Sequence, residues 1–142
     1  MKYKVVTIEA LPVIIESGYR GLSDKLEESM KVYEPQCVFF SVDYFYGVDI
    51  EFIKSVSGSV PKVLVTLDDI SLHEFNSINA LACDLVLSAD PVSVLKYEEK
   101  NICSEYLALE SSKKIYRNLG LPKTIDVLFY GNCELPNRKS LI

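Results

Sequence analysis

Two adjacent carboxylates, Asp68 and Asp69, follow an apolar run that reads KVLVT. At the end of a buried strand, a carboxylate can act as a general base toward a hydroxyl group, or it can orient a sugar by accepting hydrogen bonds from its OH groups. The alternative is structural, because acidic residues also stabilise the amino end of a following helix. We therefore treat the pair both as candidate catalytic residues and as candidate helix caps.

His73 is the only histidine of the chain and comes shortly after the Asp pair. An unperturbed imidazole has a pKa of about 6.5, so it can exchange a proton near neutral pH. His73 is thus a third candidate catalytic residue. The alternative is an ordinary surface position on an amphipathic helix.

A second group of polar and aromatic residues follows the neighbouring apolar run, which reads CVFFS. Asp43, Tyr44 and Tyr46 combine a carboxylate with rings that can stack on a sugar, although packing explains the rings equally well. Asp90 precedes Pro91, a pair typical of a helix start. We expect Asp90 to cap that helix, and we also consider it, with Asp43 and the two tyrosines, as a candidate acceptor-binding residue.

A third group lies in the sequence YGNCELPNR near the end of the chain. Gly131, Asn132 and Arg138 would surround a strand-to-helix turn, where backbone amides and a guanidinium can bind an anion such as a phosphate. The sequence has no Gly-rich fingerprint of the dinucleotide or P-loop kind. No metal site is expected, since a single histidine and four widely spaced cysteines offer too few zinc ligands.

The elements that must position these residues alternate along the chain. Runs rich in β-branched residues predict strands, and apolar residues at helical spacing predict helices. The predicted strands are 4–8, 36–41, 62–69, 84–88, 102–109 and 125–130. Four predicted helices span 23–34, 48–56, 91–99 and 111–118. A further helix is predicted after a Ser71 cap, with an apolar stripe of Leu72, Phe75, Ile78 and Leu81.

This alternation predicts an α/β fold. With right-handed crossovers it gives a Rossmann-like, doubly wound and mainly parallel sheet of about five or six strands with helices on both faces. The run 62–66 has no polar alternation, which is typical of a central strand buried on both faces.

Composition excludes several classes of protein. The 142 residues carry a formal net charge of −5, and no basic cluster suits a nucleic-acid backbone. No stretch approaches the roughly 18 consecutive apolar residues of a membrane span. The amino-terminal residues lack a signal-peptide pattern, so we expect a cytoplasmic protein.

The order of the pieces resembles the CgeB-like group of GT-B glycosyltransferases. The matching stretches are VLVTLDD, CDLVLSADPVSVLKYEE, SEYLALESS and IDVLFYGNCELPNRKSLI, which together span roughly residue 35 to the end. The match departs from the family at Ala108, where a proline is common, and at Asn132, where a small hydroxyl residue is common.

The resemblance implies two Rossmann-like domains that face each other across a cleft. Residues 1–122 would be the acceptor-side domain, and residues 123–142 would begin a truncated donor-side domain that binds a nucleotide sugar as co-substrate. No other cofactor is expected. The turn at Gly131, Asn132 and Arg138 would approach the donor phosphates. Because most of the donor domain is absent, we expect little or no transferase activity from this chain alone.

An alternative from another class is a degenerate response-regulator receiver, which would act as an interaction module. The order and spacing of the predicted strands and helices are similar to those of a receiver domain. However, Ser41 stands where the phospho-accepting aspartate is expected, and the first run ends in Glu9 without an acidic pair.

Overall fold

The computed structural model describes residues 3–41, 48–56 and 58–109, together with residues 120, 122 and 124. The chain divides into two compact units, Met1–Leu109 and Glu110–Ile142, and every helix and strand described below lies in the first unit. The predicted domain boundary after residue 122 stays a prediction.

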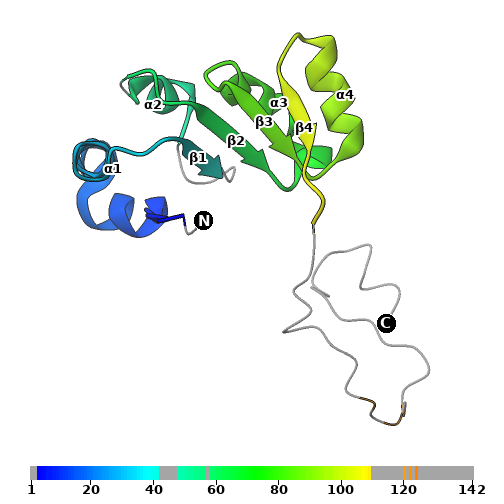
Figure 1. Ribbon diagram of the computed structural model, residues 1–142, viewed down its shortest axis with the longest axis horizontal. Coiled ribbons are helices and arrows are strands. Elements are labelled where there is room, and N and C mark those ends of the chain that lie inside the picture. The colour runs from blue at the N-terminus through cyan, green and yellow to red at the C-terminus, as the bar shows by residue number, and fades with distance from the viewer. Residues whose placement is uncertain are drawn as a thin grey trace. The chain divides into compact units, whose positions relative to one another are not determined.

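Four parallel strands form the sheet: β1 (Val38–Ser41), β2 (Lys62–Thr66), β3 (Leu85–Ser88) and β4 (Ser104–Tyr106). They lie side by side in the order β1-β2-β3-β4 (Figure 1). The α/β class and the parallel pairing predicted from the sequence are confirmed, and β2 is an interior strand. The described residues form four strands rather than five or six.

Three helices connect consecutive strands: α2 (Ile50–Ser55), α3 (Asp69–Ala80) and α4 (Pro91–Glu99). Each connection advances by one strand in the same direction, so right-handed crossovers place all three helices on one face of the sheet. In agreement, α3 contacts β2, β3 and both neighbouring helices, while α4 contacts β3 and β4. A helix layer on the second face stays a prediction.

The two faces of the sheet differ in burial. On the face covered by the helices, Phe40, Leu64 and Val86 stand in register and are all buried. Side chains alternate between the faces along each strand. On the opposite face Val63 is buried, Leu87 is half-buried and Phe39 is 63% exposed. The main cluster of buried hydrophobic residues joins the helix-covered face of the sheet to α2, α3 and α4, and it also includes Leu22 near the amino end of the chain.

The first helix, α1 (Ala10–Tyr33), begins well before the predicted start at Ser23. Gly18 interrupts it with φ 68° and ψ −176°, a backbone conformation that glycine adopts without steric cost. The helix ends at Tyr33, and its C-cap residue Glu34, in the left-handed region, directly precedes Pro35. The predicted end at this proline is confirmed, because proline restricts the residue before it to non-helical conformations.

The predicted strand over residues 4–8 is wrong for this structure, since residues 3–9 form neither helix nor strand. Its β-branched residues fit a pleated surface only where a neighbouring strand and a packed face are present. Val5 has neither and is 82% exposed. The predicted helix 111–118 and strand 125–130 lie outside the described residues.

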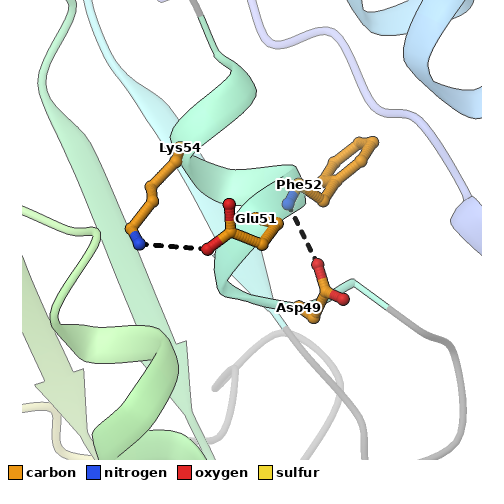
Figure 2. A network of polar contacts seen from close by, with 4 residues as sticks. All are labelled: Asp49, Glu51, Phe52 and Lys54. Atoms are coloured by element: carbon orange, nitrogen blue, oxygen red, sulfur yellow. Dashed lines mark hydrogen bonds and ion pairs between the residues drawn. The ribbon is translucent and has the colours of Figure 1, made fainter.

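The helix α2 confirms the prediction for residues 48–56 (Figure 2). A side-chain oxygen of Asp49 accepts a hydrogen bond from the backbone N–H of Phe52 at 3.0 Å and so caps the helix. Lys54 and Glu51 form an exposed ion pair at 3.1 Å. Ile53, on the inner side of this short helix, is fully buried.

The helix α3 presents a polar face to the sheet. It begins at Asp69 rather than after a Ser71 cap; the Ser71 hydroxyl instead donates to the carbonyl of Asp68 within the first turn. Two residues of the predicted apolar stripe, Ile78 and Leu81, are exposed. The buried residues of this helix are Asp69, Asn76, Ser77, Asn79 and Ala80. Helical spacing predicted the helix correctly but not which of its faces packs on the sheet.

Candidate functional site at the carboxyl edge of the sheet

The candidate residues after β2 and β3 lie at one edge of the sheet. Thr66 and Ser88, the last residues of these strands, stand in register as parallel neighbours. Asp68 and Asp69 follow the first strand, and Asp90 follows the second. Open parallel sheets bind ligands at this carboxyl edge.

Asp69 is fully buried and is the centre of a hydrogen-bonded cluster. Its Oδ2 accepts short hydrogen bonds from the hydroxyls of Thr66 and Ser88. Its Oδ1 accepts from Asn76 Nδ2 at 2.8 Å and from the Tyr97 hydroxyl at 2.9 Å. We call these five residues the Asp69 hub. The hub joins β2, β3, α3 and α4 through a single carboxylate.

The hub argues against a role of Asp69 as a catalytic base. A residue with 0% exposure does not contact a substrate, and both of its oxygens already accept hydrogen bonds. A buried carboxylate costs free energy unless it is hydrogen-bonded, and the neutral donors of the hub meet that requirement. Asp69 is therefore a structural residue that fixes the elements below the edge.

Tyr97 provides the hub donor from α4. Burial, followed by the nearby Asp69 carboxylate, raises the pKa of the Tyr97 hydroxyl far above its usual value. The phenol accordingly stays protonated at every physiological pH, and it stays a donor to Asp69. Tyr97 is one of the largest fully buried side chains of the described residues.

Ser88 connects the hub to the turn between β3 and α4. Its hydroxyl donates a hydrogen bond to Asp69, and its oxygen accepts one from the backbone N–H of Asp90 at 3.1 Å. The buried carboxylate thereby holds the start of α4 as well as that of α3.

Asp90 is a helix cap, as predicted from the Asp-Pro pair. Its carboxylate accepts from the Ser93 hydroxyl at 2.7 Å and from the backbone N–H groups of Ser93 and Val92 at 3.0 and 3.3 Å. The Ser93 hydroxyl, more than these two amides, lowers the pKa of Asp90. Both carboxylate oxygens are engaged inside the protein, so the structure favours the capping role over acceptor binding.

Asp68 is the exposed carboxylate of this edge. It occupies the N-cap position of α3, yet its side chain makes no capping hydrogen bond. Its backbone carbonyl accepts instead from the N–H groups of Ser71 and Leu72 at 3.2 and 3.1 Å. The backbone at Asp68 is thus held in place while its carboxylate faces solvent, where a ligand hydroxyl can reach it.

His73 belongs to the contact between α3 and α4 rather than to the exposed edge. Its Nε2 lies 3.2 Å from Ser77 Oγ, and its ring packs against Tyr97 with 4.6 Å between centroids. Burial, and after it the charge of Lys100, lowers the pKa of His73. The predicted catalytic group therefore divides into an exposed Asp68, a buried Asp69 and a histidine between two helices.

The remaining predicted site residues lie outside the described residues: Asp43, Tyr44, Tyr46, Gly131, Asn132 and Arg138. Within the described part of the chain, no three His, Cys, Asp or Glu side chains are grouped so as to hold a metal ion. No helix of that part combines the length and apolar character needed to cross a membrane.

Sequence reasoning missed most of the Asp69 hub. Thr66, Ser88, Asn76 and Tyr97 were not singled out as partners of Asp69. A signal was present, because the apolar runs KVLVT and LVLS both end in a hydroxyl residue. A hydroxyl buried at the end of a strand needs a hydrogen-bond partner, and Asp69 follows Thr66 closely in the sequence.

No family model, curated protein or solved structure matches this chain. The geometry of the edge and the sequence resemblance therefore carry the functional proposal together.

Proposed function

We propose that the chain contains the acceptor-side domain of a cytoplasmic GT-B glycosyltransferase resembling the CgeB-like group. In this proposal the whole enzyme transfers a sugar from a nucleotide-sugar donor to a hydroxyl of a sugar or glycan acceptor. The observation that carries the proposal is the exposed carboxylate of Asp68 at the carboxyl edge of a parallel sheet. Both carboxylate oxygens of the neighbouring Asp69 already accept hydrogen bonds inside the protein.

Asp68 would accept a hydrogen bond from the acceptor hydroxyl and, as a general base, take its proton when the new glycosidic bond forms. The Asp69 hub supports this role because it fixes the turn that carries Asp68. A carboxylate on a fixed turn loses little conformational freedom when it binds a ligand. Asp43, Tyr44 and Tyr46, in the segment that follows β1, would complete the acceptor wall.

The donor side would come from the second domain. Gly131, Asn132 and Arg138 belong to the segment proposed to meet the donor phosphates. Stabilisation of the departing diphosphate needs preorganised donors and positive charge. Nucleic acid has no part in the proposed reaction.

In this proposal the domain also has the complete sheet expected from the sequence, which is doubly wound and has about five or six strands. The four described strands follow one another in a single winding direction. In a doubly wound sheet, a run of this kind forms one half. The 63% exposure of Phe39 on the face opposite the helices supports a second layer there, because parallel sheets are usually covered on both faces.

The receiver alternative receives less support from the strand order. A receiver sheet has five strands in the order 2-1-3-4-5. If β1, β2 and β3 were its third, fourth and fifth strands, β4 would be an additional sixth strand. The parallel pairing of β4 with β3 continues the sheet in the same direction and suits a larger Rossmann-like domain.

Acceptor binding can be tested by chemical-shift mapping of the 142-residue chain with a panel of neutral mono- and disaccharides. We expect shifts at the carboxyl edge, and we expect Asp68→Asn to weaken binding about tenfold, since a hydrogen bond to a charged group contributes roughly 1.5–3 kcal/mol. Asp24→Asn, which alters an aspartate on α1, is the matched control and should leave binding unchanged. Equal binding by wild type and Asp68→Asn, or no sugar binding at all, would refute the proposal.

A further inference from the structure

The contact between α3 and α4 contains a cluster of four side chains that includes the single histidine of the chain. Ser77 Oγ lies 3.2 Å from His73 Nε2 and 3.0 Å from Lys100 Nζ. The His73 ring lies against the Tyr97 ring, with 4.6 Å between centroids and 48° between the planes. We call these four residues the His73 cluster, and it shares Tyr97 with the Asp69 hub.

Hydrogen-bond chemistry limits the roles that the members of this cluster can take. A lysine ammonium can only donate, so Ser77 Oγ must accept from Lys100. A serine hydroxyl has one hydrogen of its own, and the other partner of Ser77 is His73 Nε2. A hydroxyl oxygen can accept two hydrogen bonds, so Ser77 either donates to Nε2 of a neutral imidazole or accepts from an Nε2–H.

Protonation of His73 conflicts with this arrangement. It leaves two cations sharing one hydroxyl, Lys100 and the charged imidazole. His73 Nδ1 is also buried and has no hydrogen-bond partner among the described residues, so the charged ring gains no acceptor there. A cationic imidazole is consequently poorly accommodated between the two helices.

Other charged groups act on His73 from both helices. Burial is the main cause that disfavours the imidazolium, and Lys100 at the carboxyl end of α4 and Lys96 on α4 add to it. Asp69 on α3 and Asp90 at the start of α4 favour the imidazolium, and the net result is a pKa of His73 below the usual value. The neutral form thus contributes stability that is fully present above a pH of about 6.5 and declines as the pH falls below that value.

We propose that His73 is a pH-sensitive switch of the α3–α4 contact, and that its protonation loosens Tyr97 from the Asp69 carboxylate. The order of events follows the contacts. Protonation places a positive charge beside Lys100, and the ring that this repulsion displaces no longer supports the Tyr97 ring. The Asp69 hub then loses its donor from α4, and the hub also holds the Asp90 amide through Ser88. The switch does not depend on the proposed transferase function.

The test is an NMR titration of the 142-residue chain from pH 8 to pH 5, in which the single histidine makes the imidazole signals unambiguous. We expect a His73 midpoint below 6.5, with the Tyr97 ring and Asp90 amide signals moving at the same midpoint. Lys100→Gln should move all three midpoints upward. Lys54→Gln, a change in the exposed ion pair of α2, is the matched control and should move none of them.

Two outcomes overturn the switch. One is a His73 midpoint that Lys100→Gln leaves unchanged. The other is a set of Tyr97 and Asp90 signals that stay flat while His73 titrates, or that still titrate in a folded His73→Gln variant. If His73→Gln does not fold, the comparison of Lys100→Gln with Lys54→Gln decides the question.

Discussion

Tyr97→Phe tests the Asp69 hub with the smallest possible change. The substitution keeps the ring, its packing against His73 and its place in the core, and it removes the hydroxyl that donates to Asp69 Oδ1 at 2.9 Å. Asp69 Oδ1 then keeps a single donor, Asn76. Loss of a hydrogen bond to a charged and buried acceptor should lower the free energy of unfolding by about 1.5–3 kcal/mol.

Urea denaturation measures this loss. With a denaturant slope of about 1–3 kcal/mol per molar urea, the midpoint should fall by roughly 1 M while the slope stays unchanged. Tyr106→Phe is the matched control, because Tyr106 is 54% exposed on β4, and a surface change of this kind should alter stability by less than about 0.5 kcal/mol. In an Asp69→Ala background, Tyr97→Phe should have a much smaller effect than in wild type, because the two residues act as a pair.

The hub would be refuted if Tyr97→Phe and Tyr106→Phe had equal effects on the free energy of unfolding. It would also be refuted if Tyr97→Phe had the same effect with and without the Asp69 carboxylate, since the loss would then come from packing rather than from the hydrogen bond.

Three further predictions follow from single residues. Asp90→Ala should lower the melting temperature of the chain at pH 7, because α4 loses its cap. Since the pKa of Asp90 is lowered in the folded protein, this difference from wild type should shrink as the pH falls through the range where the carboxyl group becomes protonated. A difference that stays constant with pH would contradict the capping role. Burial raises the pKa of Cys83 to about 11, so at pH 8 iodoacetamide should modify the exposed Cys103 well before Cys83. Mass spectrometry of peptides measures the two rates of modification, and equal rates would argue against the burial of Cys83. Because the pKa of Tyr97 is raised on folding, wild type should lose stability as the pH rises above about 10, and Tyr97→Phe should lose less over the same range in denaturation series.

Local signals in the sequence determined much of this fold. The β-branched run 62–66 and the apolar runs on either side predicted the parallel strands, because buried parallel strands need continuous apolar residues. The Asp90–Pro91 pair predicted the start of α4 together with its cap, since both signals act within one turn of the helix. Similarly, Pro35 predicted the end of α1.

Long-range contacts decided what the sequence left open. The β-branched residues 4–8 form no strand, because a strand needs a partner that local sequence does not specify. The inner face of α3 was mispredicted for a related reason. Thr66 and Ser88 end the strands beneath it, and they favour Asp69 and Asn76 over the apolar residues Ile78 and Leu81.

The two adjacent aspartates show the same division most clearly. By type and position, Asp68 and Asp69 are equivalent candidates for general base, sugar ligand or helix cap. The folded chain separates them, because the first residue of α3 points under the sheet edge while the residue before it faces solvent. Residue type thus determined that an acidic group stands at this edge, and only the packing of four elements around one carboxylate decided which aspartate stays available to a ligand.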